Sequence, residues 1–232
     1  MGTLILLRHG RSTANSVGVL AGRTPGVGLD EHGQAQVRTL VERLAQLPLA
    51  AVVSSPLQRC RETVEPLAGA RGLEVTVDDR FVEVDYGEWT GRELRTLGKE
   101  PLWKVVQAHP SAAVFPGGEG LAALQARAVA AVREWDAKLA AEHGPRVLWL
   151  VCTHGDIIKA VLADALGMHL DGFQRIVVNP CSVSAVSYTE TRPFVQRVND
   201  SGADLQSLIP PKRRRRQRPS SDATPGGPTG TG

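Results

Sequence analysis

The stretch LILLRHGRSTAN, from Leu4 to Asn15, starts with four aliphatic residues and then changes abruptly to an arginine, a histidine and a glycine. An apolar run this short predicts a buried parallel strand rather than a helix. Arg8 and His9 then stand at the carboxyl end of the strand, which is the edge of an open α/β sheet where ligands bind. For this stretch alone, a solvated arginine beside a surface histidine is the simpler interpretation.

Two further apolar runs end in residues of the same kind. The run from Val147 leads through Cys152 and Thr153 to His154 and Gly155, and the run at residues 50–54 leads through a Ser-Pro pair to Arg59. Because parallel strands end at one edge of a sheet, we expect His9, Arg59 and His154 to lie together there. Arg59 also falls in the first turn of a predicted helix, where backbone N–H groups favour an anion.

Four blocks of sequence, in order, resemble the histidine phosphatase superfamily, also called the phosphoglycerate mutase-like family. They are LLRHGRSTAN at residues 6–15, SSPLQRCRET at 54–63, FVEVDYGEWTG at 81–91 and THGDIIKAVLADALG at 153–167. The resemblance covers residues 3–198 and implies an α/β fold. We therefore expect a single three-layer domain with a mostly parallel central sheet and helices on both faces.

The resemblance also implies roles for individual residues. The family's catalytic positions match His9 as the phosphorylated nucleophile and Glu83 as the general acid, together with the phosphate-binding Arg8, Arg59 and His154. Asp85 and Glu88 are alternative acids in the same loop. The expected substrate-binding residues are Arg8, Asn15, Gly22, Arg23, Arg59, His154 and Gly155.

These residue types suit phosphoryl transfer from a monoester. A neutral imidazole is a competent nucleophile near pH 7, arginine forks match the phosphate oxygens, and a protonated carboxyl can protonate a leaving alkoxide. Since the protein supplies the positive charge itself, we expect neither a metal nor another cofactor. The predicted activity is metal-independent hydrolysis of a small-molecule phosphate ester.

Two other functions stay open. One is a phosphomutase, either a phosphoglycerate mutase that depends on 2,3-bisphosphoglycerate or another phosphomutase. Such a mutase resembles this sequence at the same central residues, but Asp156 stands where mutases have asparagine, and an acid there disfavours binding of bisphosphoglycerate. The region from Arg92 to Glu119 also lacks the paired arginines expected of a mutase. The second alternative is a non-catalytic module that binds a phosphorylated ligand or a protein.

Charge and composition divide the chain at residue 200. Residues 201–232 hold six Lys and Arg against two Asp, a net +4 out of the total of +3, so residues 1–200 carry −1. We predict a catalytic domain at 1–200 and a disordered basic, Pro- and Gly-rich tail at 201–232, because so few apolar residues cannot offset the entropy of ordering. The run KRRRRQR favours weak polyanion binding, and the tail should be dispensable for turnover.

The cysteines and the hydropathy pattern bear on the compartment. Cys60, Cys152 and Cys181 are an odd number without the spacing of a zinc site, and we interpret them as reduced thiols. The N-terminus lacks the pattern of a signal peptide, and no apolar run is long enough to span a membrane. We therefore expect a cytoplasmic protein, with its oligomeric state left open and a homodimer as one option.

Overall fold

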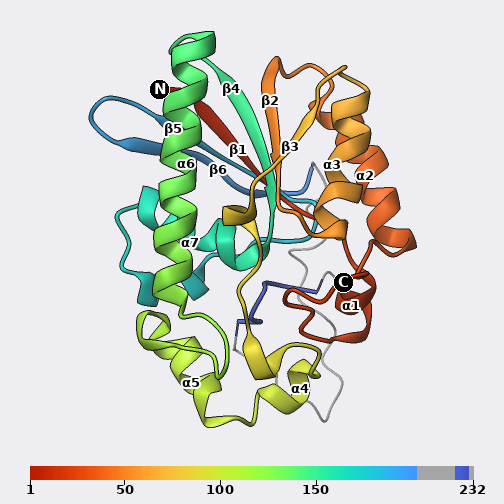
Figure 1. Cartoon of the computed structure of the whole chain (residues 1–232), viewed down its shortest axis with the longest axis vertical. Helices are drawn as coiled ribbons and strands as arrows, with labels where there is room; N and C mark the ends of the chain where they lie inside the picture. Colours follow the sequence, from red (N-terminus) through yellow and green to blue (C-terminus); the bar gives the residue numbers. More distant parts are fainter. Residues whose placement is uncertain (203–222, 230–232) are drawn as a thin grey trace.

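The computed structural model describes residues 1–202 and 223–229 and shows one α/β domain (Figure 1). In the described residues six strands form a single sheet in the order β3-β2-β4-β1-β5-β6. The first four in that order run parallel, and β5 and β6 are antiparallel additions at one side. The strands are β1 Thr3–Arg8, β2 Leu49–Ser54, β3 Val75–Val77, β4 Leu148–Thr153, β5 Val183–Tyr188 and β6 Pro193–Asp200.

The apolar run of β1 is continuous because both faces of the sheet are covered. Successive strand residues point to opposite faces. Accordingly, Leu4 and Leu6 belong to the core under α6 and α7, whereas Ile5 and Leu7 belong to the core under α2 and α3. All four side chains are buried.

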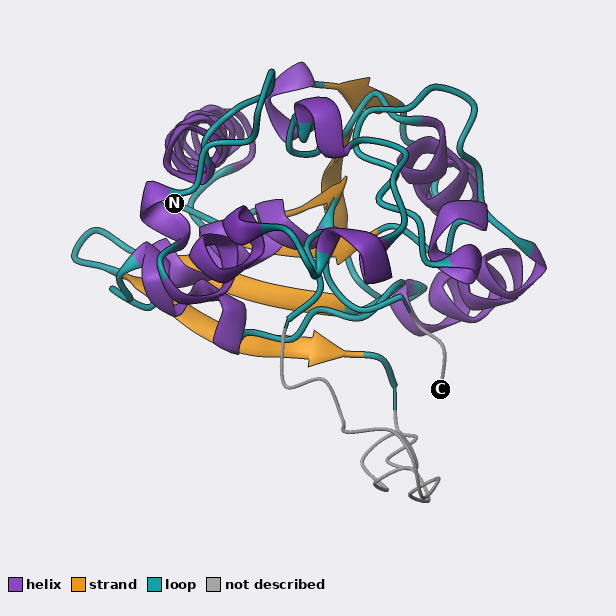
Figure 2. Cartoon of the chain, turned by 90° about the horizontal axis from the view of Figure 1, so that it is seen from below, coloured by secondary structure: helices purple, strands orange, loops and turns teal. Residues whose placement is uncertain are grey.

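Helices lie on both sides of the twisted sheet, which confirms the expected three layers (Figure 2). The α-helices are α1 Thr13–Val17, α2 Glu31–Leu44, α3 Gln58–Gly69, α4 Leu94–Leu97, α5 Pro101–Ala108, α6 Leu121–His143 and α7 Gly155–Ala165. Short 3-10 helices occur at η1 Asp79–Phe81, η2 Gly87–Trp89, η3 Pro110–Ala112 and η4 Leu170–Arg175. Within the described part of the chain, no helix is long and apolar enough to cross a membrane.

The connections contain more structure than their Gly- and Pro-rich sequences indicate. The segment after β1 begins with the short helix α1, which Ser12 caps by accepting the backbone N–H of Asn15 while the Asn15 side chain accepts that of Ser12. This reciprocal pair is a capping box formed with asparagine instead of glutamate. The connection before α6 likewise contains α4 and α5.

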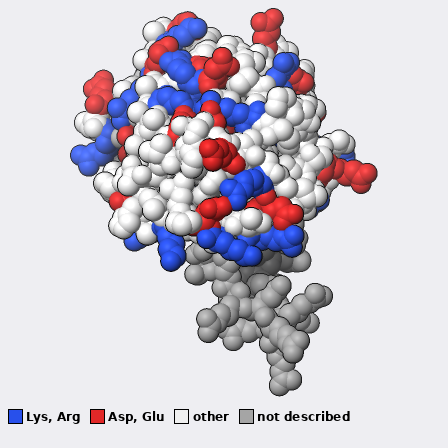
Figure 3. All heavy atoms as spheres, turned by 60° about the horizontal axis from the view of Figure 1, so that its bottom comes forward, with Lys and Arg blue, Asp and Glu red and all other residues white. Residues whose placement is uncertain are grey.

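The last strand of the described residues, β6, ends at Asp200. Most of the predicted disordered tail, including the basic run at residues 212–218, lies outside the described residues. Residues 223–229 differ from the prediction of disorder, because the structure places them against the carboxyl edge of the sheet, as the blue segment below the strands in Figure 1. On the face drawn in Figure 3, basic and acidic side chains are intermixed.

Candidate active site

The pairing of β1 with β4 brings two histidines together. Arg8 and Thr153 are partners in the parallel ladder, and His9 extends it by donating its backbone N–H to the Thr153 carbonyl at 3.0 Å. His9 and His154 are the residues that follow the two strands. Their rings lie edge to face with centroids 5.2 Å apart, and both are buried. The expected meeting of the strand ends is therefore present.

One ring nitrogen of His9 is hydrogen-bonded to a backbone carbonyl, and the other faces the guanidinium of Arg59. Nδ1 lies 2.7 Å from the carbonyl oxygen of Gly10, an acceptor, so Nδ1 carries the proton and donates it there. Nε2 is then the unprotonated nitrogen, and it accepts from Arg59 Nε at 3.3 Å. Burial, followed by the charges of Arg59 and Arg8, lowers the pKa of His9 well below its usual value. The imidazole is thus neutral with its lone pair directed into the site.

Arg59 connects the two histidines. Its Nη2 donates to the carbonyl of Gly22 at 2.8 Å and contacts Nδ1 of His154 at 3.2 Å. The backbone of α3 is held near β1 by Thr63, whose hydroxyl accepts the Gly10 N–H and donates to the Arg59 carbonyl. This pair of bonds sets the position of the guanidinium relative to His9.

Arg8 is buried, and two backbone carbonyls occupy one of its nitrogens. Nη1 donates to Val178 O at 2.6 Å and to Pro228 O at 2.7 Å. Burial lowers its pKa to about 10, which leaves the guanidinium charged at neutral pH. Nε of Arg8 and Nη1 of Arg59 are buried without a hydrogen-bond partner among the described residues. An unpaired buried donor is costly, and an anion between the two arginines would satisfy both.

Glu83 is the buried carboxyl of the site. Its Oε1 accepts the backbone N–H of Val84, and its Oε2 lies 3.9 Å from Nδ1 of His154. Burial, reinforced by the charge of Asp156, raises the pKa of Glu83 to about 7. The alternative acids lie differently, since Asp85 is 42% exposed at its side chain and Glu88 is exposed.

His154 is the N-cap of α7, and it is neutral in this arrangement. Burial and the charge of Arg59 lower its pKa well below the usual value. Its Nδ1 accepts from Arg59, so Nε2 carries the proton and donates to Ser55 Oγ at 2.8 Å. His154 therefore offers a hydrogen bond to a ligand through Nδ1 only after it takes up a second proton.

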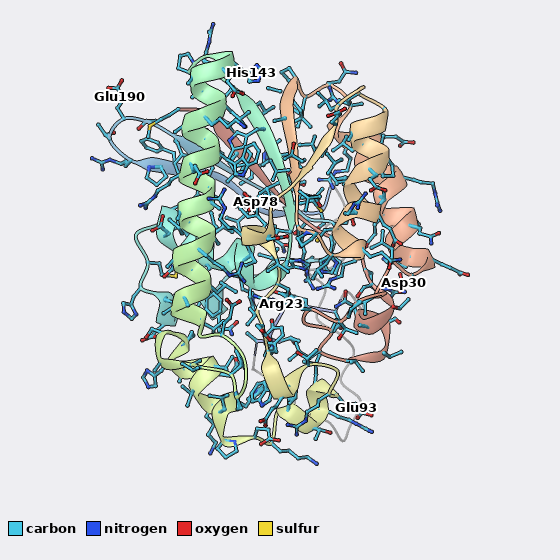
Figure 4. All side chains as sticks on the ribbon, viewed as in Figure 1. Arg23, Asp30, Asp78, Glu93, His143 and Glu190 are labelled. Carbon is cyan, nitrogen blue, oxygen red and sulfur yellow. The ribbon has the colours of Figure 1, made fainter. Side chains whose placement is uncertain are left out.

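Of the four remaining predicted substrate-binding residues, two line the pocket and two do not. Asn15 and Gly22 line the pocket beside His9. Arg23, labelled near the centre of Figure 4, does not. Its Nε donates to the backbone carbonyl of Glu83 at 2.8 Å, and its Nη2 pairs with Glu119. Gly155 begins α7 and faces the tail rather than the lining.

Several functional neighbours have no signal in the local sequence. Arg127 of α6 donates to the same Glu83 carbonyl and to Glu119, so the acid loop is held from two sides. Tyr86 lines the pocket and donates its hydroxyl to Asp156 at 2.9 Å. Asp156 also pairs with the buried Lys159 at 3.2 Å. The i,i+3 spacing of Asp156 and Lys159 is equally compatible with a surface pair, so the sequence gives no sign that this pair is buried.

Gly10 is needed for close packing rather than for an unusual backbone angle. Its φ is not positive, so the backbone angle itself does not require glycine. A Cβ at Gly10 would lie 3.1 Å from the carbonyl oxygen of Gly33.

Within residues 1–202 and 223–229, no group of three or more His, Cys, Asp or Glu is arranged to hold a metal ion.

Comparison with known proteins agrees with this geometry. The histidine phosphatase superfamily (branch 1) matches residues 4–201. The chain belongs to this superfamily. Among related histidine phosphatases, phosphoserine phosphatase 1 of Hydrogenobacter thermophilus is 30% identical over 199 residues, which cover 84% of this chain and 91% of that protein. A probable phosphoglycerate mutase, GpmB of Salmonella choleraesuis, is 28% identical, with coverage of 89% and 94%.

Solved structures show the same histidine phosphatase fold. YhfR of Bacillus stearothermophilus superposes with a TM-score of 0.77 at 26% identity, covering 86% of this chain and 98% of that one. A mycobacterial glucosyl-3-phosphoglycerate phosphatase gives 0.75 at 24% identity, covering 85% and 98%. These two structural similarities confirm the predicted fold.

The raised pKa of Glu83 predicts a pH-dependent cost to stability in this histidine phosphatase. Between pH 4.5, the ordinary value, and about 7, the unfolded chain ionises at this position while the folded chain keeps its proton. The folded state is therefore penalised by an amount that grows over this interval to about 3 kcal/mol and persists above it. Glu83→Gln should stabilise the protein by about that amount at pH 8 and by little at pH 4.5.

Urea unfolding of both proteins at the two pH values measures this difference. Glu88→Gln, which removes an exposed carboxyl from the same loop, is the matched control. An equal effect of Glu83→Gln at both pH values would contradict the assignment of the raised pKa.

Proposed function

We propose that this chain hydrolyses phosphate monoesters through a phosphohistidine formed on His9. The observation that carries the proposal is the ring orientation of His9, whose Nδ1 proton is bound to Gly10 O and whose Nε2 lone pair meets the cation Arg59. A nucleophile held this way attacks a phosphorus atom whose oxygens are bound by the same cation. The phosphatase named among the relatives supports the same activity.

In the first step Nε2 of His9 forms a bond to phosphorus while the bond to the leaving oxygen breaks. Arg8 and Arg59 neutralise the equatorial oxygens through their unpaired N–H groups. Glu83, with a pKa of about 7, is protonated in about half of the molecules at pH 7, and this protonated form donates its proton to the departing alkoxide. The products of this step are the alcohol, phosphohistidine and the Glu83 carboxylate.

In the second step a water molecule attacks the phosphohistidine. The Glu83 carboxylate accepts a proton from that water, the N–P bond breaks, and inorganic phosphate leaves a neutral His9. Arg23 and Arg127 hold the backbone carbonyl of Glu83, so they position the carboxyl without contacting the reacting atoms. His154 can take up a proton when the dianion is bound, because the dianion offsets the charge of Arg59 that disfavours it.

A bisphosphoglycerate-dependent mutase is the alternative, and the pocket lining disfavours it. In the described residues, Arg8 and Arg59 are the only arginine or lysine side chains of the lining. Arg92 pairs with Glu100, and Arg95 is exposed and pairs with Glu93. A substrate with two phosphates and a carboxylate would need more cations than this pocket holds. Incubation with 3-phosphoglycerate and bisphosphoglycerate should therefore release phosphate without forming 2-phosphoglycerate.

Two finer expectations also stand as proposals. The buried, unpaired Cys60, Cys152 and Cys181 favour a reducing compartment, so we propose a cytoplasmic location, which subcellular fractionation tests. The basic run at residues 212–218 favours weak, salt-sensitive binding to polyanions. Polyanion binding that does not weaken as the salt concentration rises from about 50 to about 200 mM would contradict this proposal.

His9→Ala should remove turnover and phosphoenzyme together, because both depend on the same nitrogen. We expect a loss of at least about 10⁴-fold in kcat and no acid-labile label from a phosphorylated substrate. Rapid-quench labelling measures the phosphoenzyme. His32→Ala, which removes an exposed histidine from α2, should behave like the parent. Normal labelling of His9→Ala would move the nucleophile elsewhere.

Glu83→Gln should discriminate between leaving groups. An alkyl alkoxide needs a proton, so its hydrolysis should slow by about 10² to 10⁴-fold, whereas nitrophenyl phosphate, whose phenolate leaves unaided, should slow by less than about tenfold. In the parent, kcat/KM for the alkyl ester should fall above pH 7, since the acid loses its proton there. Equal losses on both esters would show that Glu83 is not the acid.

Activity should persist in a strong chelator, because arginines supply the charge that a metal would provide. We expect the rate in excess EDTA to stay within about twofold of the untreated rate. Assays with magnesium, zinc and manganese added back complete the test. A loss that one of these ions restores would show that charge neutralisation by Arg8 and Arg59 is insufficient.

A further inference from the structure

A segment from the end of the chain occupies the pocket. Residues 223–229 lie beside Arg8, His9 and Glu83, and most of them belong to the lining. In Figure 1 this segment is the blue trace below the sheet, between α7 and α1. The proposed reaction does not involve residues 223–229, although they line the same pocket as Arg8, His9 and Glu83.

The segment is shaped as a tight turn by its own sequence. Gly227 donates its backbone N–H to the Thr224 carbonyl at 2.7 Å, which closes the turn Thr224-Pro225-Gly226-Gly227. Pro225 stands at the second position, and Gly226 at the third has φ +77°. Proline followed by a glycine with positive φ is the pattern of a type II turn. Residues 223–229 thus form a compact segment with this turn at its centre, which we call the knob.

Three elements of the domain hold the knob. Gln107 of α5 both donates to the Ala223 carbonyl at 2.7 Å and accepts its N–H at 2.8 Å. Asp156 of α7 accepts the Gly226 N–H at 2.9 Å. Arg8 at the end of β1 donates to the Pro228 carbonyl at 2.7 Å. The last contact uses Nη1 of the same guanidinium whose unpaired Nε is proposed to bind phosphate.

Glycines on both sides allow the close fit. A Cβ at Gly155 would lie 2.2 Å from the carbonyl oxygen of Gly226, and one at Gly227 would lie 2.9 Å from Nη1 of Arg8. With the knob in place about 30 Å³ of the pocket stays free. This volume holds about two water molecules and cannot hold a phosphate ester. The knob and the substrate therefore exclude each other.

We propose that the pocket is also a binding site for the chain's own segment 223–229, an internal peptide ligand that competes with the phosphate ester. The proposal rests on the proposed function, since it takes Arg8 as a phosphate-binding group. Because ligand and pocket belong to one chain, the effective concentration of the knob is high without any partner. The apparent affinity for substrate then falls in proportion to the fraction of molecules with an open pocket.

The test uses full-length variants that spare the catalytic residues. Gly227→Val disfavours the knob, because valine is strained at φ +86° and its Cβ would crowd Arg8. Gln107→Ala removes both bonds to Ala223, and Lys104→Ala, an exposed change on the same helix, is its control. KM for a small phosphomonoester and the dissociation constant of inorganic phosphate by calorimetry are the readouts.

We expect Gly227→Val to lower both constants by about tenfold and Gln107→Ala by about threefold, with kcat within about twofold of the parent and Lys104→Ala unchanged. A synthetic peptide of residues 221–232, added to full-length Gly227→Val, should raise KM without changing kcat. The same peptide with valine in place of Gly227 should have no such effect.

Unchanged constants in both variants would overturn the proposal. So would weaker substrate or phosphate binding, because it would make the segment part of the substrate site rather than its competitor. Tighter phosphate binding without turnover of any ester would support the knob and reject the proposed function, so the two failures are distinguishable. Melting temperatures of the variants verify that each folds like the parent.

Discussion

The parallel pairing of β1 with β4 is the constraint on which the site depends. It places Arg8 opposite Thr153 and continues into the His9 backbone, so two residues 145 positions apart, His9 and His154, follow neighbouring strand ends. Both strands are buried on both faces, which prevents a shift of register without exposing aliphatic side chains. The hydrophobic core thereby sets the separation of the two imidazoles at 5.2 Å between ring centroids.

The same burial accounts for the protonation states. Two arginines without a carboxylate in direct contact disfavour any further positive charge, which keeps both histidines neutral. The same low-dielectric surroundings raise the pKa of Glu83 to about 7, so a substantial fraction of this carboxyl keeps its proton near neutral pH. Neutral imidazoles, buried guanidinium groups and a carboxyl of raised pKa thus follow from one environment, and binding of a dianion would relieve the repulsion between Arg8 and Arg59.

The backbone of Glu83 is held by side chains that lie outside the pocket lining. Arg23 and Arg127 both donate to the Glu83 carbonyl, and Glu119 bridges the two arginines through its carboxylate. The loop that carries Glu83 needs such bonds, because its own backbone forms no sheet ladder at this point. On the opposite side, the knob at residues 223–229 contacts Arg8 and Asp156, so the pocket is closed by a segment distant in the sequence.

The sequence by itself determined the fold and the central residues of the site, because these depend on patterns within short windows. Aliphatic runs that end in Arg8-His9 and His154 indicate strand ends, and the four family blocks indicate the order in which they assemble. The roles of these residues stay predictions until the variants are measured.

Only the tertiary structure decided which groups surround that centre. No local pattern indicates that Arg23 holds the Glu83 backbone instead of lining the pocket, or that Tyr86 bonds to Asp156. The composition of residues 223–229 predicts disorder, because the backbone carbonyl and N–H groups that dock this segment are present in every residue except for proline's missing N–H and give no sequence signal. Their partners come from three separate elements, and long-range contacts of this kind are specified by packing rather than by the identity of neighbouring residues.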